Sequence, residues 1–347
     1  MFPRLPASWS YVRPSLATLP SLTSQFGLRS ASQVRHDLER VRDGVLGGGS
    51  FDLDLSTAGF FRPDLSLPAY AGFVPADGIA PIVHFFDRVG GGRGFHGAIT
   101  RVRARDYRGG RLTYDEHDGT DFVCPRGTPV VAAAPGVLVA TRDRWLRGGL
   151  TACVDHGGGV VTQYTHLTRL LVPIGQPLER GQEFALSGVS GLDMLSGAPW
   201  VPPHVHFMVW LAGSPLDPFT GPGEPAPLWA DREPRAATGA LPGDPSPDAV
   251  ARSLDASVDE ASVDRALRTC RSPELRAEIE SAPTLPARAA ILEDALHHER
   301  EHFPVDLAAP LRRGVGSVRP RLSLPLTASL YRGAAPADVP WTAPPDA

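Results

Sequence analysis

Short runs of β-forming residues separated by glycine turns fill the middle of the chain, between residues 80 and 220. Residues 128–141 carry strand-type side chains on both sides of Pro135-Gly136, and residues 151–164 repeat the pattern around the glycines at 157–159. β-Branched and aromatic residues fit the pleated surface of a strand, whereas glycine relaxes the backbone at tight turns. The pattern therefore predicts a mainly β core over residues 80–220, an antiparallel barrel or sandwich.

The segments on either side of this core differ from it in composition. Residues 1–79 hold one expected short helix, at 30–43, and an extended region rich in proline and glycine. Residues 221–245 are dense in proline, glycine and alanine, which is typical of a linker. Residues 246–347 are expected to form a small α-helical domain with an extended tail. Its predicted helices each open with serine or threonine and a proline one or two residues later, and span residues 246–270, 272–281 and 284–303.

The composition argues against several classes of function. A formal net charge of -4 and a pI near 6.3 give no basic surface for nucleic acid or an anionic membrane. No stretch approaches the ~20 apolar residues of a membrane span, and prolines interrupt the start of the chain where a secretory signal needs an apolar run. The 3 cysteines are too few and too irregularly spaced for a disulfide framework. The sequence leaves the compartment and the oligomeric state open.

Two histidine motifs inside the predicted β core could meet at one metal ion. His117 and Asp121 are four residues apart, with Gly119 between them to relax the backbone, so both side chains can converge. His204 and His206 alternate along a predicted strand and project from the same face. One of these imidazoles can bind a metal while the other stands beside it.

A third motif, Tyr164-Thr165-His166, could bring a further imidazole to that face, again by strand alternation. In this order the motifs resemble the lysostaphin/LytM-type zinc metallopeptidases, whose pattern is His-x-x-x-Asp, then Tyr-x-His, then His-x-His. The resemblance implies a β fold of the duplicated-hybrid-motif type and one Zn²⁺ per chain. It also implies hydrolysis of peptide bonds, usually in the peptides of bacterial peptidoglycan.

Carried over residue by residue, the resemblance makes His117, Asp121 and His206 the zinc ligands. Two nitrogens and one carboxylate oxygen leave the fourth tetrahedral position to a water, whose pKa zinc lowers to about 7. The resemblance makes His166 and His204 the catalytic imidazoles. One would accept a proton from the attacking water, and the other would stabilise the charge that develops on the carbonyl oxygen. The sequence leaves these two roles unassigned.

Two departures from the family pattern bear on these expectations. Residues 192–203 make the segment before His204 longer than the family usually has, so we expect a loop on the rim of the cleft that influences substrate choice. Met208 stands where the family commonly has glutamate, and we expect a change of packing there without loss of catalysis.

A rival metalloprotease signature lies near the end of the predicted helices. Residues 298–302 read His-Glu-Arg-Glu-His, which on a helix would place two imidazoles one turn apart with a glutamate base beside them. The charged middle positions, Pro304 and the lack of a downstream glutamate as third ligand argue against a zinc site. We therefore predict a solvated helix end and no catalytic role for Glu299.

The remaining histidines and the cysteines suit structural roles better than metal binding. His84 and His96 could line the cleft, but packing is the simpler interpretation, and His156 sits beside the three-glycine turn. Cys124 and Cys153 are expected to be small buried hydrophobes.

The sequence thus predicts a zinc metalloendopeptidase that acts on peptidoglycan peptides. Two alternatives stay open: a catalytically silent LytM-like module that binds and regulates a cell-wall hydrolase, and a metallopeptidase that acts on proteins. The complete set of ligands favours an active enzyme.

Overall fold

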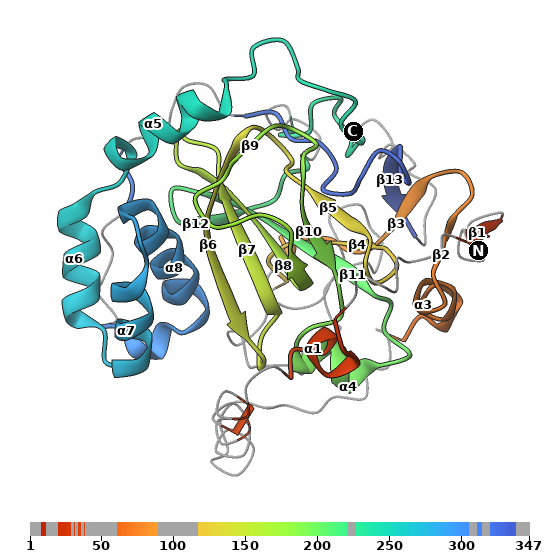
Figure 1. Ribbon diagram of the computed structural model, residues 1–347, viewed down its shortest axis with the longest axis horizontal. Coiled ribbons are helices and arrows are strands. Elements are labelled where there is room, and N and C mark those ends of the chain that lie inside the picture. Colours follow the sequence, from red (N-terminus) through yellow and green to blue (C-terminus); the bar gives the residue numbers. More distant parts are fainter. Residues whose placement is uncertain are drawn as a thin grey trace.

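The computed structural model describes residues 8–11, 20–28, 61–88, 117–220, 227–304, 311–313 and 320–337, with four single positions between 29 and 40. Apart from those four positions, the helix predicted at 30–43 lies outside the described residues, as does His96. Figure 1 shows a β-sheet at the centre, with four helices against one side of it.

The sheet is almost entirely antiparallel, which confirms the predicted mainly β core. Its strand order is β13-β3-β4-β11-β8-β7-β6-β9, with β10 paired to β5 and β8, and β12 paired to β11. The exception to the antiparallel pairing is β13, which lies parallel to β3. A separate two-stranded sheet pairs β1 (Trp9–Tyr11) with β2 (Phe73–Pro75). The strands of the main sheet are β3 (Ile79–His84), β4 (Thr120–Val123), β5 (Pro129–Val131), β6 (Gly136–Arg144), β7 (Gly149–Asp155), β8 (Val160–Leu170), β9 (Pro177–Leu178), β10 (Glu183–Ser187), β11 (His204–Leu211), β12 (Ser214–Leu216) and β13 (Gly333–Pro336).

The interior of the sheet is an apolar core with aromatic side chains at its centre. The Tyr164 ring meets Phe184 and Phe207 edge-on, with ring centroids 4.9 and 5.3 Å apart. Trp229, from the segment expected to be a linker, is also buried in this core. The tail adds three buried leucines to it, at positions 322, 324 and 326. Burial of each such side chain stabilises the fold by about 1.5–3 kcal/mol, so both segments contribute to the β core.

Four helices follow the strands and pack on the other face of the sheet. They are α5 (Pro247–Ser257), α6 (Glu260–Thr269), α7 (Pro273–Ser281) and α8 (Leu285–His298), and a short 3-10 helix, η2 (Arg300–His302), comes after them. Each N-cap side chain accepts a hydrogen bond from a backbone N–H of the first turn, as the serine and threonine signals predicted. The span predicted at 246–270 is two helices because Asp259 caps a second one. None of the described helices is long and apolar enough to cross a membrane.

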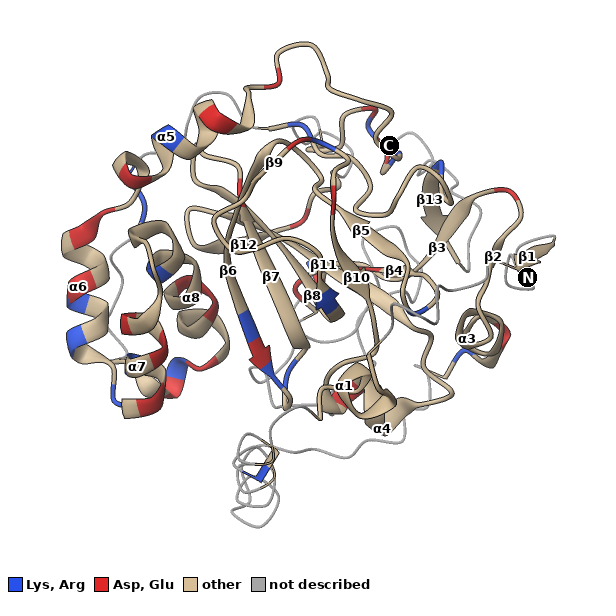
Figure 2. Cartoon of the chain, viewed as in Figure 1, with Lys and Arg blue, Asp and Glu red and all other residues tan. Residues whose placement is uncertain are grey.

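Charge distinguishes the helices from the sheet that they cover. Figure 2 shows that charged residues of both signs are frequent along α5 to α8 and sparse along the strands. Beneath the helices the contact is apolar, and residues of β6, β7, β8 and β11 share one buried cluster with all four helices. Sheet and helices therefore pack as two layers around a common core.

Strand β11 contributes to both faces of the sheet by simple alternation. Val205, Phe207 and Val209 point into the aromatic core. Met208 and Trp210 point the other way, into the cluster shared with the helices. By the same alternation His204 and His206 belong to the helix-covered face. His204 and His206 thus lie on the same side of β11 as Met208 and Trp210, which contact the helices.

Candidate metal centre

Four neighbouring strands, β3, β4, β11 and β8, bring the residues of the histidine motifs together. His206 on β11 lies opposite Asp121 on one side and Thr165 on the other. His84 on β3 pairs with Asp121 from its far side. Residues paired across adjacent strands have Cβ atoms about 4.5–5.5 Å apart, so side chains on one face meet. His117 enters from the loop just before β4.

The donor atoms of His117, Asp121 and His206 form a small buried triangle. Asp121 Oδ1 lies 2.8 Å from His206 Nδ1 and 3.2 Å from His117 Nε2, and the two ring nitrogens are 3.1 Å apart. Zinc ligands at about 2.0–2.1 Å in a tetrahedron lie roughly 3.3 Å from one another. The triangle therefore has the size of one face of such a tetrahedron, and its two nitrogens and one oxygen suit zinc.

In each potential ligand, the nitrogen or oxygen atom that does not belong to the triangle makes a further hydrogen bond. The Nδ1–H of His117 donates to the Phe85 carbonyl oxygen at 2.7 Å, which leaves Nε2 facing the triangle. The Nε2 of His206 lies 3.2 Å from Asp118 Oδ1, and His84 Nδ1 lies 2.8 Å from Asp121 Oδ2. Metal-binding imidazoles typically have their second nitrogen fixed in this way.

Charges around the triangle shift the pKa values of its members. Burial lowers the pKa of His206, but hydrogen bonds with Asp118 and Asp121 outweigh it and raise the pKa to about 9. Burial raises the pKa of Asp121, but the neighbouring imidazoles of His117 and His204 hold it well below its usual value. Two carboxylates, of Asp118 and Asp121, therefore face the imidazoles at hydrogen-bond distance, and their negative charge would favour a bound cation.

Gly119 is required by a close approach. A Cβ atom at this position would lie 2.7 Å from both His206 Cε1 and the Phe207 carbonyl oxygen. Any side chain would therefore displace the β11 strand or the imidazole. The absence of a side chain at Gly119 therefore leaves room for the His206 imidazole in the site.

His166 and His204 stand beside the triangle with their rings in contact. Their ring centroids are 4.8 Å apart, and each Nδ1–H donates at 2.8 Å to a backbone carbonyl, of Ser190 and Pro202 respectively. The Nε2 of His204 lies 3.7 Å from Asp121 Oδ1. Burial, with the neighbouring His166, outweighs the attraction of Asp121 and lowers the pKa of His204 to about 3. This ring is therefore neutral at neutral pH.

His166 reaches this face only because the strand breaks its alternation there. Tyr164 points into the aromatic core, and regular alternation would send His166 after it. Instead His166 has a φ of 60°, and its N–H donates to the Gly148 carbonyl oxygen at 2.9 Å. A left-handed conformation costs a non-glycine residue about 1–2 kcal/mol. The structure places His166 beside His204, but strand alternation, from which this position was predicted, does not account for it.

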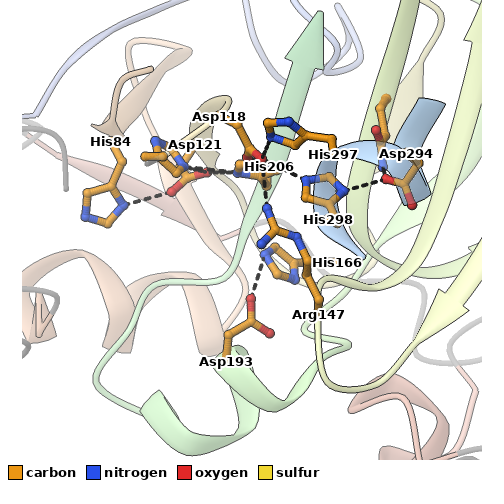
Figure 3. A network of polar contacts seen from close by, with 12 residues as sticks. His84, Asp118, Asp121, Arg147, His166, Asp193, His206, Asp294, His297 and His298 are labelled. Carbon is orange, nitrogen blue, oxygen red and sulfur yellow. Dashed lines mark hydrogen bonds and ion pairs between the residues drawn. The ribbon is translucent and has the colours of Figure 1, made fainter. Parts of the chain in front are cut away.

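A second group of side chains, not expected from the sequence, lies beside the triangle. Asp118 Oδ2 lies 2.8 Å from His298 Nε2, 3.2 Å from His297 Nε2 and 2.8 Å from an Arg147 nitrogen, as Figure 3 shows. The two histidines end helix α8, roughly 180 positions after Asp118. Residues so far apart in the sequence cannot be paired by spacing or periodicity. The two adjacent histidines at the end of a predicted helix were the one sequence feature that pointed to a polar contact there.

The rival signature at 298–302 has a different structure from the one its pattern suggests. Helix α8 ends at His298, so His302 does not follow it on the same helix. Glu299 is only 7% exposed and accepts a hydrogen bond of 2.7 Å from Arg142. The prediction of a solvated helix end is therefore wrong for Glu299, because an arginine of β6 reaches it. Among the described residues, the groups that could hold a metal do not include His302.

The remaining candidates divide between the site and the core. His84 was expected to pack elsewhere, and that was wrong, since it contacts Asp121 directly. His156 is buried and bonds to Pro135 O and Thr162 Oγ1, in a structural role. Cys124 and Cys153 are buried free thiols, as predicted. Met208 packs between sheet and helices, as expected of a change in packing.

The long segment at 192–203 begins with helix α4 (Leu192–Gly197) and lies beside the site. Its Asp193 carboxylate is 3.4 Å from His166 Nε2. Helix α3 (Pro63–Tyr70) supports the far end, where Ser66 Oγ donates to the Val201 carbonyl oxygen at 3.1 Å. Trp200 is 47% exposed between these contacts. The segment is therefore held in place at both ends and carries an exposed aromatic side chain between them.

Comparison with known proteins identifies the segment that contains these motifs. Residues 115–218 match the model of peptidase family M23. The peptidoglycan DD-endopeptidase ShyA of Vibrio cholerae is 39% identical over 101 residues, which are 29% of this chain and 22% of that protein. The chain thus covers about a fifth of the length of this relative. The resemblance to lysostaphin/LytM-type peptidases is confirmed over this segment.

Two solved structures are also similar. A zinc-containing peptidase from Vibrio cholerae is 28% identical, with a TM-score of 0.27 and coverage of 40% of this chain and 39% of that one. The catalytic domain of lysostaphin from Staphylococcus simulans is 28% identical, with a TM-score of 0.26 and coverage of 30% of this chain and 76% of that one.

Proposed function

From the peptidase family M23 domain at residues 115–218, we propose that this chain is a zinc-dependent endopeptidase that cleaves peptides of peptidoglycan. The observation that carries the proposal is the triangle of donor atoms from His117, Asp121 and His206. The sequence similarity to a peptidoglycan DD-endopeptidase supports the substrate class. Peptidoglycan lies outside the cytoplasm, so this substrate implies an extracytoplasmic site of action.

The three donor atoms would hold one zinc ion, and the fixed tautomers of the ligands support that role. Phe85 O holds the Nδ1–H of His117, and Asp118 lies against Nε2 of His206, so the opposite nitrogens face the triangle. A bound zinc ion would supply a Lewis acid that polarises the scissile carbonyl and activates a water at neutral pH.

His204 is suited to accept the proton of the attacking water. Its Nδ1–H is already donated to the Pro202 carbonyl oxygen, so Nε2 carries the lone pair, and this nitrogen lies 3.7 Å from Asp121 Oδ1, beside the triangle. We assign the proton transfer to His204, which leaves stabilisation of the charge that develops on the carbonyl oxygen to His166.

Isolated peptidoglycan sacculi test the proposal directly. Purified protein is incubated with sacculi and, separately, with unfolded protein substrates, each with and without a chelator. We expect chelator-sensitive release of peptides from sacculi and none from protein. Release from protein alone would favour a general metallopeptidase. Zinc binding without hydrolysis of either substrate would favour a silent regulatory module.

We also propose that the rim at 192–203 selects among peptides. Trp200 is exposed on it, and Asp193 approaches His166. Trp200→Ala should change the ratio of kcat/KM between two stem peptides by about tenfold, in keeping with the loss of one apolar contact of roughly 1–3 kcal/mol. Zinc content should stay at one per chain. An unchanged ratio would reduce the rim to a structural segment.

A further inference from the structure

A line of hydrogen bonds runs from the candidate metal centre into helix α8. His206 Nε2 lies 3.2 Å from Asp118 Oδ1, Asp118 Oδ2 lies 2.8 Å from His298 Nε2, and His298 Nδ1 lies 2.9 Å from Asp294 Oδ1. Figure 3 shows these side chains in one row, imidazole and carboxylate in turn. Asp118, Asp294 and His298 are all nearly inaccessible to solvent, so water competes little for these contacts.

The far end of this line is anchored on the sheet. Gln163 of β8 donates to Asp294 Oδ1 at 2.9 Å, and Trp210 of β11 donates to Gln163 Oε1 at 2.8 Å. Arg142 of β6 also donates to Asp294. The Trp210 ring meets His298 at 90°, with ring centroids 5.9 Å apart. Asp294 therefore has little freedom, and neither has the imidazole that it holds.

We propose that His298 is a positioning residue for the zinc ligand His206, acting through Asp118. The inference rests on the proposed zinc site. A carboxylate that fixes the second nitrogen of a ligand works only if the carboxylate is itself fixed. His298 holds Asp118 from the side opposite to the metal. Helix α8, which lies outside the M23 domain, is thus part of the metal centre.

A second metal ion between Asp118, His297 and His298 is the main alternative, since their donor atoms lie within 4.8 Å of one another. The position of Arg147 argues against it. Its guanidinium is 2.8 Å from Asp118 Oδ2, the same oxygen that both imidazoles approach. A cation bound there would sit beside a permanent positive charge, in a partly buried site where solvent screens the repulsion only in part.

The affinity for zinc tests the inference without reference to activity. Zinc dissociation constants are measured by competition with a chelator for the wild type, His298→Gln, Asp118→Asn and the double variant. We expect His298→Gln to weaken zinc binding about tenfold, at the lower end of the roughly 10- to 100-fold range for outer-shell partners. The double variant should bind zinc about as weakly as Asp118→Asn alone, because His298 acts through Asp118.

His302→Ala is the control. This histidine lies four residues further on, its side chain is 29% exposed, and its Nε2 lies 3.8 Å from Glu301 Oε1. Its zinc affinity should equal that of the wild type. Urea unfolding in the presence of chelator separates loss of zinc affinity from loss of fold. A variant that unfolds at wild-type urea concentration is a valid comparison.

Three outcomes would overturn the inference: unchanged zinc affinity in a folded His298→Gln, additive effects in the double variant, or two zinc ions per wild-type chain with one lost in His298→Gln. Failure of the wild type to bind zinc at all would be a different result. It would overturn the proposed function, on which this inference depends.

Discussion

Two histidine motifs in this chain have the residue types of a metalloprotease site, and they differ in what faces their side chains. His204 and His206 lie on a strand between two other strands, and register places Asp121 directly opposite His206. His298 and His302 flank Glu299, but the helix ends between the two histidines. The glutamate carboxylate accepts a hydrogen bond from Arg142 instead of facing them. Donor types alone thus define neither site. Convergence on one point comes from backbone pairing, and an arginine within reach diverts a carboxylate from a metal.

The largest effect should follow from removing a ligand of the first motif. His206→Ala deletes one of three donors, and the remaining two cannot hold zinc in a stable site. We expect its zinc affinity to fall by a factor on the order of 10³, a third or so of the free energy typical of zinc sites. Elemental analysis of the purified variant measures the bound metal. One zinc per chain in His206→Ala would show that the triangle is not the site.

The next effect separates the two imidazoles beside the triangle from the three ligands within it. His204→Ala and His166→Ala should keep their zinc, because the Nδ1 atoms of both residues bond to backbone carbonyls and neither contributes to the triangle. Peptide hydrolysis should fall about 10²- to 10⁴-fold in each. The check is kcat on a stem peptide at equal zinc content. Near-normal turnover in both variants would contradict the assigned roles.

The sequence was sufficient for the features that depend on local pattern. The β core, the helix caps and the pairing of His204 with His206 all follow from periodicity or from residue type. The left-handed conformation at His166 does not, since no glycine or asparagine marks it. The contact between Asp118 and His298 could not be predicted either, because it depends on how a helical layer packs on the sheet.

Buried ion pairs could not be predicted for the same reason. Its charged neighbours predicted that Glu299 is solvated, but its side chain lies against Arg142 of β6. Arg312 similarly joins Glu293 of α8, at 2.8 Å, to Asp155 of β7. Arg142 and Glu299 are 157 positions apart in the sequence, and so are Asp155 and Arg312. Partners this far apart in the sequence can be identified only when the packing of the helices on the sheet is known.

A smaller effect is expected at the second motif. Glu299→Gln should keep zinc and activity, and should instead lower the free energy of unfolding by about 1–3 kcal/mol, because a charged hydrogen bond to buried Arg142 is weakened. Urea unfolding measures the change. Glu301→Gln is the matched control, since its side chain is 57% exposed, and it should unfold as the wild type does. Loss of zinc or of hydrolysis in a folded Glu299→Gln would make the second motif the active site.

The smallest effect is the pH dependence of that same difference in stability. Burial raises the pKa of Glu299, but Arg142 and Arg144 outweigh it and hold the pKa below its ordinary value of 4.5. A carboxyl group whose pKa is lower in the folded state stabilises the fold fully above about pH 4.5 and loses that contribution as the pH falls through the folded pKa. The stability gap between wild type and Glu299→Gln should therefore narrow below about pH 4.

Other buried carboxyl groups of α8 also have shifted pKa values, but they are common to the two proteins compared. Arg142 and His298 hold the pKa of Asp294 well below its usual value, against the effect of burial, whereas burial outweighs Arg312 and raises the pKa of Glu293. These groups are present in both proteins, so their contributions largely cancel in the difference. Urea midpoints measured from pH 6 to pH 3 give the gap at each pH. A gap that stayed constant down to pH 3 would mean that Glu299 contributes packing but no charge to the contact with Arg142, and the contrast between the two motifs would then lose its electrostatic basis.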